Sequence, residues 1–433
     1  MFVSDCLGVN SQGHLTIGER DTLELAQTFG TPLYVMDENQ IRQNCRSYKQ
    51  SMEKYYDGRG MVAFAAKSFC CKAICKIVME EGLGMDVVSS GELYTALSVG
   101  FPAEKLLFHG NNKPPVELTY AVRSGVGRIV VDNIYELELL NEIAKADNKK
   151  VTIHFRIKPG IDAHTHDFTK TGQIDSKFGF ALETGEAFEA IRQAIGMSHI
   201  HLAGLHCHIG SQIFGVEPFQ LAGEVMVGLM AKVKDELGYE IAELNLGGGY
   251  GIQYTPENNP VEYGSYMEMV SRTVKENCAK HGLNTPFIIM EPGRSISGPA
   301  GITLYTVGGI KEIPNIRTYV SVDGGMADNP RYALYKAEYD MMIAGKATQP
   351  KASVVTVAGR CCESGDLLGE NVKLQPVQVG DTLAVLATGA YNYSMSSNYN
   401  RLAKPAVVMV NGKDARVVVK RETHEDLVRN DLL

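Results

Sequence analysis

The amino-acid sequence predicts an α/β protein in which a (β/α)8 barrel is followed by a second, all-β domain. Over the first two thirds of the chain, short apolar runs alternate with amphipathic or alanine-rich stretches that are long enough for helices. Apolar strands separated by helices are typical of a parallel sheet that is covered on both faces. After about residue 295, strand-like runs follow one another without helices between them. The chain has 433 residues, which exceeds what one hydrophobic core usually supports.

Eight strands are expected before residue 295, and this number favours a closed barrel over an open sheet. Helices such as Ile134–Ala146 and Gly223–Leu237 are expected between them. A Rossmann fold is the competing interpretation, but its glycine-rich turn should follow the first strand, whereas the run Gly247–Gly251 follows the seventh. Barrels of this type commonly bind phosphate near that point. The predicted strands are Met61–Ala66, Gly84–Val88, Leu106–Phe108, Arg128–Val131, Val151–Ile157, Ala203–His208, Glu243–Leu246 and Phe287–Met290.

The last third of the chain predicts a separate β domain. Asn411–Asp414 is a turn signal that would join the two strands on either side of it as a hairpin. The short N-terminal segment is expected to join this domain. We therefore predict a barrel over residues 33–295, and a β-sandwich or barrel made of residues 1–32 plus 296–433. The predicted strands of the second domain include Val354–Val357, Thr382–Leu386, Ala406–Val410 and Ala415–Val419.

The composition is that of an ordinary globular protein, with 44% hydrophobic and 21% charged residues. The net charge of -8, with acidic and basic residues interspersed, argues against a nucleic-acid partner. The sequence shows neither an apolar run of membrane-spanning length nor a secretion signal, so no membrane partner is expected. The nine cysteines do not have the spacing of a disulfide framework, which favours a cytoplasmic location.

Polar residues gather where the predicted barrel strands end, and this is where (β/α)8 barrels build their chemistry. Lys67 follows the first strand, in a place that we expect to be poorly solvated. Desolvation disfavours the ammonium form, so this amine could act as a nucleophile. By itself, the lysine also fits a strand cap that reaches water. The residues at or just past the strand ends are Lys67, Asp86, Ser89, His109, Asp132, Arg156, His208, Gly247 and Glu291.

Several of these positions suit a charged ligand. Gly247–Gly249 offers backbone N–H groups that no side chain obstructs, which suits a phosphate, although an ordinary tight turn explains it too. Glu291 could hold a pyridine nitrogen protonated, and a Pro-Gly turn is the competing interpretation. Arg294 and Arg331 offer guanidinium groups for carboxylate or phosphate, although surface arginines are common.

A histidine pair and a cysteine-containing loop complete the candidate groups. His206 and His208 stand two apart on a predicted strand and would share a face. Zinc needs further ligands with metal-site spacing, and the sequence offers none, so no metal is predicted. A core histidine, or an imidazole lying against an aromatic cofactor, fits better. In the loop Cys361–Asp366, a thiol beside carboxylates suits a proton donor near a cationic substrate, and a solvated acidic turn is the alternative.

Together these motifs resemble the fold-type III pyridoxal-phosphate decarboxylases, whose fold is of the alanine racemase-like type. They occur in the order of that family and cover nearly the whole chain. The residues that carry the resemblance are Phe64-Ala-Ala-Lys67-Ser, His206-Cys-His208-Ile-Gly-Ser211-Gln, Gly247-Gly-Gly, Glu291-Pro-Gly-Arg294, Cys362-Glu363-Ser-Gly-Asp366 and Gly389-Ala-Tyr391. One departure is the sequence around the lysine, where many members have Tyr-Ala-Xaa-Lys-Ala-Asn.

Further segments are similar to the members of the family that decarboxylate meso-2,6-diaminopimelate to L-lysine and CO2 in the last step of lysine biosynthesis. Such a substrate has a zwitterionic group at each end, so its site needs both cations and an anion beyond the reacting carbon. Ornithine, arginine and carboxynorspermidine decarboxylases are the alternatives, and a catalytically silent relative is a further one. The segments are Asp162-Ala-His-Thr-His-Asp167, Ser176-Lys-Phe-Gly179 and Asn329-Pro-Arg331-Tyr-Ala-Leu-Tyr335.

The resemblance implies a role for each matching residue. Lys67 would hold pyridoxal 5'-phosphate covalently, His208 would stack on its ring and take part in catalysis, and Glu291 would pair with the pyridine nitrogen. Cys362 would donate a proton and, with Glu363, would come from the partner subunit of a homodimer. The cofactor would be bound by Lys67, Asp86, His208, Ser211, Gly248, Gly249, Glu291, Gly293, Arg294 and Tyr391. The amino-acid substrate would be bound by Arg294, Arg331, Tyr335, Glu363 and Tyr391.

Overall fold

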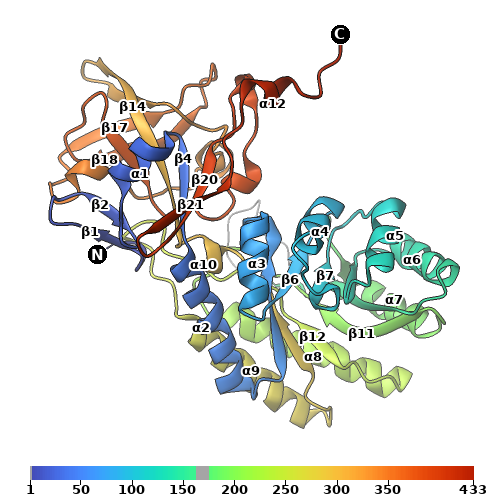
Figure 1. The fold of residues 1–433 in the computed structure, drawn as a ribbon. Coiled ribbons are helices and arrows are strands. Elements are labelled where there is room, and N and C mark those ends of the chain that lie inside the picture. Colours follow the sequence, from blue (N-terminus) through green and yellow to red (C-terminus); the bar gives the residue numbers. More distant parts are fainter. Residues whose placement is uncertain (1, 162–174) are drawn as a thin grey trace. The chain divides into compact units, whose positions relative to one another are not determined.

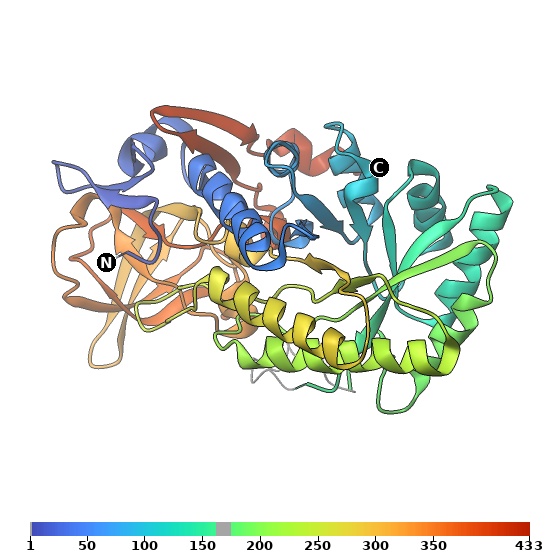
Figure 2. The same ribbon diagram turned by 90° about the horizontal axis from the view of Figure 1, so that it is seen from below.

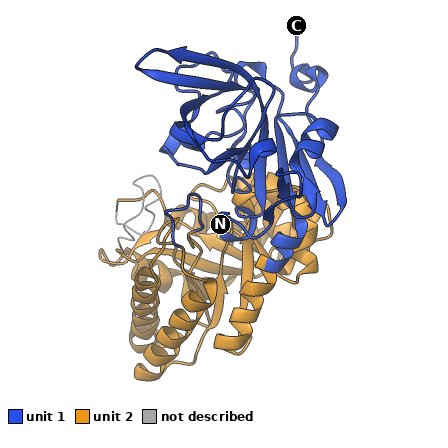
Figure 3. Ribbon diagram, turned by 90° about the vertical axis from the view of Figure 1, so that its left-hand side faces the viewer, with its two compact units in different colours: residues 1–43, 252–259, 294–433 blue, residues 44–251, 260–293 orange. Residues whose placement is uncertain are grey.

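The computed structural model describes residues 2–161 and 175–433, which form two compact units (Figure 3). The barrel unit comprises Asn44–Gly251 and Pro260–Gly293. The β unit comprises Met1–Gln43, Ile252–Asn259 and Arg294–Leu433. These bounds differ from those of the predicted domains, because residues 33–43, 252–259 and 294–295 belong to the β unit.

The barrel unit contains a closed sheet of eight parallel strands in the order β5-β6-β7-β8-β9-β11-β12-β13, closed by pairing of β13 with β5. This confirms the predicted (β/α)8 barrel, and every predicted strand is found within three residues of its expected bounds. A ninth, two-residue strand, β10 (Phe180–Ala181), extends the sheet beside β9. The barrel strands are β5 (Gly60–Ala65), β6 (Gly84–Val87), β7 (Leu106–Phe108), β8 (Arg128–Val131), β9 (Val151–Lys158), β11 (Ile200–His206), β12 (Glu243–Asn245) and β13 (Phe287–Met290).

Helices follow the barrel strands and surround them (Figures 1 and 2). Side chains at the strand ends start some of these helices. Ser89 accepts a hydrogen bond from the N–H of Glu92 at the start of α4, and Asn133 does the same for Glu136 at the start of α6. The helices are α2 (Glu38–Tyr56), which crosses the boundary between the units, α3 (Lys72–Glu80), α4 (Ser90–Leu97), α5 (Pro115–Ser124), α6 (Ile134–Ala146), α7 (Glu186–Ile195), α8 (Glu217–Leu237) and α9 (Tyr263–Lys280).

The β unit is built on a mixed sheet in the order β18-β17-β15-β14-β4-β20-β21, with β16 and β19 joined to it through β14. β20 (Ala406–Asn411) and β21 (Asp414–Val419) are antiparallel across a turn in which Gly412 has a φ of 57°, which confirms the predicted hairpin. β4 (Leu33–Asp37) lies between β14 and β20, so this strand of the predicted barrel domain belongs to the second sheet. The remaining strands are β14 (Gly301–Ile313), β15 (Arg317–Val322), β16 (Met341–Ile343), β17 (Ser353–Ala358), β18 (Leu367–Leu374) and β19 (Thr382–Val385).

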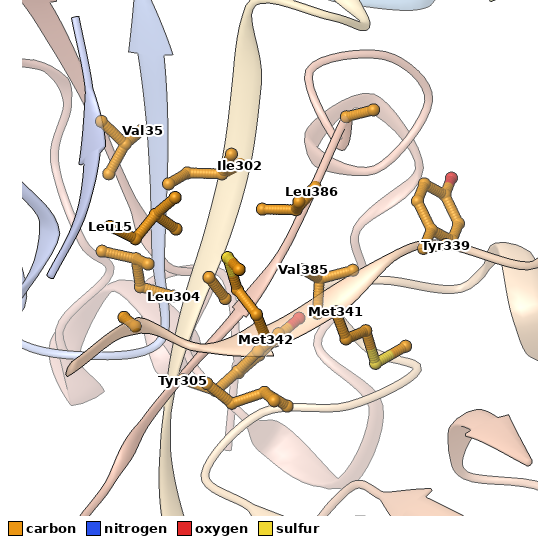
Figure 4. Close-up of a cluster of buried hydrophobic side chains, with 14 of the residues drawn as sticks. Leu15, Val35, Ile302, Leu304, Tyr305, Tyr339, Met341, Met342, Val385 and Leu386 are labelled. Atoms are coloured by element: carbon orange, nitrogen blue, oxygen red, sulfur yellow. The ribbon is translucent and has the colours of Figure 1, made fainter. Parts of the chain in front are cut away.

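The N-terminal segment packs onto the core of this sheet (Figure 4). Leu15 on β2 lies in one buried apolar cluster with Val35 on β4, Ile302 and Leu304 on β14, and Val385 on β19. The segment itself forms a separate sheet of β1 (Leu7–Val9), β2 (Leu15–Ile17) and β3 (Arg20–Asp21). Short helices accompany the strands, so the unit is not purely β: α1 (Thr22–Phe29), α10 (Arg294–Ser297), α11 (Arg331–Tyr335) and α12 (His424–Val428). Among the described residues, no helix combines the length and apolar character needed to cross a bilayer.

Candidate active site

Lys67 lies just past the carboxyl end of the first barrel strand. β5 ends at Ala65, and Lys67 is the central residue of the 3-10 turn Ala66–Ser68. The hydroxyl of Ser68 donates a hydrogen bond of 2.8 Å to the carbonyl of Ala65, which closes this turn. The lysine itself is exposed, so the prediction of a poorly solvated amine is wrong. The strand is buried as expected, but it stops two residues short of the lysine.

Glu291 follows β13 and is the centre of a buried hydrogen-bond network at the carboxyl ends of four strands. Its Oε1 accepts from Nδ2 of Asn245 at 2.6 Å and from Nε2 of His109 at 2.7 Å. Its Oε2 lies 3.2 Å from Nε2 of His206. Burial would raise the pKa of Glu291, but the histidines His109 and His206 hold it well below the usual value. The carboxylate is therefore ionised, with fixed partners on both oxygens.

The two histidines in this network differ in charge. Burial favours the neutral form of His109, yet the carboxylates of Asp86, at 3.9 Å, and Glu291 raise its pKa above the usual value. Burial lowers the pKa of His206 to about 3, and Glu291 only partly opposes this shift. Burial also raises the pKa of Asp86, against the effect of His109. His109 is thus the cationic partner of Glu291, and His206 is a neutral donor.

The glycine run after β12 forms a tight cradle in which side chains cannot be accommodated. A Cβ on Gly248 would lie 2.1 Å from the carbonyl oxygen of Glu291, and one on Gly249 would lie 2.4 Å from that of Gly210. Gly247 and Gly249 also have positive φ values, of 67° and 114°. Such a turn exposes backbone N–H groups, which is the arrangement that binds phosphate groups.

His208 lies beside this cradle. A Cβ on Gly247 would come within 3.0 Å of Nδ1 of His208. Burial, and then the positive charge of Lys67, lower the pKa of His208 well below its usual value, so the ring is neutral. β11 ends at His206, so the prediction that His206 and His208 share one strand face is wrong. Ser211, in the same loop, is half-buried.

Glu291 and the two histidines bonded to it also meet the distance requirement for a metal site. The nitrogen and oxygen atoms of His109, His206 and Glu291 lie within 4.8 Å of one another. The hydrogen bonds account for this closeness without an ion, because a carboxylate can only accept and each imidazole here can donate. His206 and His208 are the two histidines weighed as a metal pair from the sequence, and the structure brings His206 together with His109 instead.

A second group of predicted residues lies in the β unit, where two arginines meet several tyrosines. The guanidinium of Arg294 lies over the ring of Tyr391 at 4.7 Å and donates a hydrogen bond to the hydroxyl of Tyr254. The guanidinium of Arg331 lies 5.5 Å from the rings of both Tyr335 and Tyr391. This group therefore joins four residues that the sequence predicted with one, Tyr254, that it did not.

Tyr254 was missed because a lone tyrosine after a glycine run carries no chemical signal in a sequence. Burial would raise its pKa, but the guanidinium groups of Arg294 and Arg331 lower it. Nε of Arg331 is buried and has no hydrogen-bond partner among the described residues. Tyr391 adopts a positive φ of 62°, a strained conformation for a tyrosine of the kind found at functional sites. The group can bind an anion with two charged donors held by aromatic rings.

The predicted cysteine loop is anchored by Asp366. Its carboxylate accepts hydrogen bonds of 2.6 Å from the backbone N–H groups of Met326 and Cys361. Burial and the neighbouring Asp366 raise the pKa of the Cys361 thiol to about 12, so this thiol stays protonated. Cys362 and Glu363 are exposed. Of the two adjacent thiols, Cys362 is the more exposed, and it is the one to which the resemblance assigns proton donation.

Gly293 and two of the segments that carry the closer resemblance remain to be placed. Gly293 is packed so closely that a Cβ would lie 2.9 Å from the Cβ of Ala65, which places it against the turn that carries Lys67. The segment Asp162–Asp167 lies outside the described residues, whereas Ser176–Gly179 is described. The N–H of Gly179 donates a hydrogen bond of 2.7 Å to Asp132, one of the residues expected at the strand ends.

Comparison with known proteins agrees with this geometry. Residues 38–298 match the family model described as "Pyridoxal-dependent decarboxylase, pyridoxal binding domain". The chain belongs to the pyridoxal-dependent decarboxylases. Diaminopimelate decarboxylase of Bacillus subtilis (strain 168) is 48% identical to it over 432 residues, which cover 100% of this chain and 98% of the relative. The enzyme of the same name from Staphylococcus aureus (strain COL) is 44% identical over 98% of each chain.

Solved structures of such decarboxylases share the whole fold. Diaminopimelate decarboxylase of M. jannaschii in complex with L-lysine has a TM-score of 0.92 and 35% identity, with coverage of 100% of this chain and 99% of that one. Diaminopimelate decarboxylase of Helicobacter pylori complexed with L-lysine has a TM-score of 0.86 and 30% identity over 94% of this chain and 98% of that one. This pyridoxal-dependent decarboxylase is therefore a lyase whose cofactor is pyridoxal phosphate.

The residues present fit that cofactor. The glycine cradle of Gly247–Gly249 suits its phosphate, and the ionised, buried carboxylate of Glu291 suits a protonated pyridine nitrogen. The accessible amine of Lys67 suits covalent attachment to its aldehyde carbon. All three lie at the carboxyl ends of barrel strands, where such barrels place their chemistry.

Proposed function

We propose that this chain decarboxylates meso-2,6-diaminopimelate to L-lysine and CO2, the last step of lysine biosynthesis. The observation that carries the proposal is the 48% identity to a diaminopimelate decarboxylase over the full length of this chain, together with the paired guanidinium groups of Arg294 and Arg331. A substrate with a distal carboxylate needs such a pair, whereas ornithine would leave one guanidinium without an anion. A lysine/ornithine decarboxylase of Vibrio vulnificus shares the fold, with a TM-score of 0.75 at 23% identity.

Bound pyridoxal phosphate supplies a protonated pyridine ring that accepts the electrons left when CO2 departs. The chain's own residues prepare this chemistry. The amine of Lys67 would hold the cofactor, and the carboxylate of Glu291 would keep the proton on its ring nitrogen. His208, whose imidazole is neutral, would stack on the ring. The phosphate is held by Ser211, Gly248, Gly249, Arg294 and Tyr391, with Asp86 and Gly293 also lining the cofactor.

Substrate recognition and proton delivery fall to residues of the β unit. Arg294, Arg331 and Tyr335 hold the distal carboxylate of the substrate, and Glu363 holds its distal ammonium. The thiol of Cys362 delivers the proton that replaces the lost carboxyl group. Its exposure, beside the half-buried and protonated Cys361, supports this assignment.

A homodimer is part of the proposal, with Cys362 and Glu363 acting at the site of the partner subunit. Apolar side chains that form a contiguous exposed patch on a monomer mark an interaction surface. Val116 and Tyr135, each the second residue of a barrel helix, are 73% and 71% exposed. These helix starts lie at the barrel end that carries Lys67, where a partner would have to dock. We also propose a cytoplasmic location, since the nine cysteines are all free thiols.

The experiment that tests the proposal measures CO2 release from meso-2,6-diaminopimelate, ornithine, arginine and carboxynorspermidine, with pyridoxal phosphate present. We expect turnover of diaminopimelate and little of the others. The variant Arg331→Met should lose at least about tenfold in kcat/KM for diaminopimelate, because a charge-assisted hydrogen bond is lost. Arg317→Met is the matched control and should keep full activity. Arg317 lies on β15 and pairs with Glu370. Preference for ornithine or arginine would overturn the substrate and keep the cofactor.

A further inference from the structure

We propose that His109 is a positioning residue for the cofactor, which fixes the carboxylate of Glu291 toward the pyridine nitrogen together with Asn245 and His206. This inference rests on the proposed function, because it concerns the same cofactor. His109, Asn245 and His206 thereby gain a role that their positions in the sequence did not indicate.

The first step is geometric. Glu291 receives one donor from each of three different strands: His109 follows β7, His206 ends β11 and Asn245 ends β12. Donors from three directions define the plane of a carboxylate, whereas one donor leaves it free to rotate. Asn245 and His206 are fully buried, and His109 is 5% exposed, so water cannot replace them.

The second step is the link from this carboxylate to the phosphate cradle. Nδ2 of Asn245 donates to Glu291, while its Oδ1 accepts a hydrogen bond of 2.9 Å from the N–H of Gly247. One amide side chain thus ties the carboxylate that meets the ring nitrogen to the first residue of the glycine turn. The same buried group would position both ends of the cofactor, and His109 adds a donor to Glu291 from the end of β7.

The third step is electrostatic. Two buried carboxylates, Asp86 and Glu291, face His109 from β6 and β13, and the buried guanidinium of Arg156 faces it from β9. His206 is neutral, so the positive charges in this group are those of His109 and Arg156. The cation at His109 lies at 2.7 Å from Glu291 and keeps it ionised in a buried place, where it would otherwise take up a proton. An ionised Glu291 is required if a ring nitrogen is to stay protonated.

The test compares His109→Leu, which removes the donor and the charge, with His109→Gln, whose amide nitrogen can replace Nε2 without the charge. Two readouts are independent of activity: the dissociation constant of pyridoxal phosphate from the apoenzyme, and the pKa of the ring nitrogen of bound, ¹⁵N-labelled cofactor by NMR. For His109→Leu we expect at least about tenfold weaker binding and a ring-nitrogen pKa lowered by about one unit, because a charge-assisted hydrogen bond is lost. His109→Gln should restore much of the affinity but not the nitrogen pKa.

The matched control is His154→Gln. His154 is also a buried histidine that pairs with a glutamate, Glu243, at 2.6 Å. Glu243 is the first residue of β12, whereas Asn245, which contacts Glu291, is its last. The variant His154→Gln should lower the free energy of unfolding while leaving both cofactor readouts unchanged. If His109→Leu does not fold, His109→Gln alone decides, since it must shift the nitrogen pKa.

The two possible failures can be told apart. If the wild-type protein neither binds pyridoxal phosphate nor releases CO2 from diaminopimelate, the proposed function is wrong. If the wild type does both, and the His109 variants match it in cofactor affinity and in nitrogen pKa, the function stands and the inference about His109 is overturned. An equal effect of His154→Gln on both readouts would also overturn it.

Discussion

Tyr254 shows how a single side chain prepares two cations to bind anions. Two guanidinium groups that share a small volume repel each other unless something between them accepts hydrogen bonds. The hydroxyl of Tyr254 accepts from Arg294, and its ring lies 5.8 Å from the guanidinium of Arg331. The ring of Tyr339 packs edge-on against Tyr254, with 4.9 Å between ring centroids. The phenol therefore holds both arginines in place before any ligand arrives.

We predict that Tyr254→Phe weakens ligand binding through Arg294 while leaving the fold intact. The ring packing is kept and only the hydroxyl that accepts from the guanidinium is lost, so KM for the amino-acid substrate should rise about tenfold. Steady-state kinetics on diaminopimelate, with thermal unfolding beside them, measure the effect. Tyr399→Phe changes an exposed tyrosine of the same unit and is the control. An unchanged KM would show that Tyr254 only fills space.

The candidate site was predicted largely from residue types placed at strand ends. Lys67, His208 and Glu291 could be predicted because their motifs stand in a fixed order along the chain. His109 was noticed only as a strand-end residue, since its meaning depends on Glu291, 182 residues away in sequence. The exposure of Lys67 could not be predicted, because it depends on one residue more or less at the end of β5.

At the scale of elements, the positions of the barrel strands could be predicted, whereas the sheet that a strand joins was harder to predict. A strand that is buried on both faces has a simple apolar signature, which is why β7, β8 and β13 match their predicted bounds residue for residue. β4 was not predicted as a strand, and its residues were placed in the barrel domain, because a short, fully buried run fits either sheet equally well. Only its pairing with β14 and β20 reveals its place.

Three barrel strands are also joined by a half-buried ion cluster, whose carboxylate should make stability depend on pH. Glu243 on β12 accepts two hydrogen bonds of 2.7 Å from the guanidinium of Arg128 on β8, and one of 2.6 Å involving His154 on β9. Burial would raise the pKa of Glu243, but Arg128 and His154 lower it to about 2. Because the folded state holds this pKa below the usual value of 4.5, the stabilisation is present above pH 4.5 and is lost as the pH falls toward 2.

We therefore predict that Glu243→Gln lowers the free energy of unfolding by about 3 kcal/mol at pH 7, and by progressively less below pH 4.5. Urea unfolding at a series of pH values measures this difference. Glu189→Gln, which breaks an exposed pair with Arg192 on α7, is the control and should change stability little at any pH. A difference from wild type that stays constant between pH 7 and pH 3 would contradict the assigned pKa.

At the scale of the whole molecule, the chemistry of the proposed reaction is divided between the two units. The barrel unit carries the lysine, the ionised carboxylate and the glycine cradle, while the β unit carries the paired arginines and the exposed thiol of Cys362. Neither unit holds all of the residues to which the proposed function assigns a role. In the proposed dimer, Lys67 of one subunit acts together with Cys362 of the other.

Mixing two inactive variants tests this statement. Lys67→Ala lacks the cofactor lysine and Cys362→Ala lacks the proton donor, so each should be inactive or nearly so as a homodimer. If sites are shared between subunits, a dimer with one copy of each variant has one fully intact site, and random reassociation of equal amounts should restore about a quarter of the wild-type activity. CO2 release from diaminopimelate before and after mixing measures this recovery. If each site were built from a single chain, no mixture of the two variants could contain an intact site, and activity would stay at the level of the separate variants.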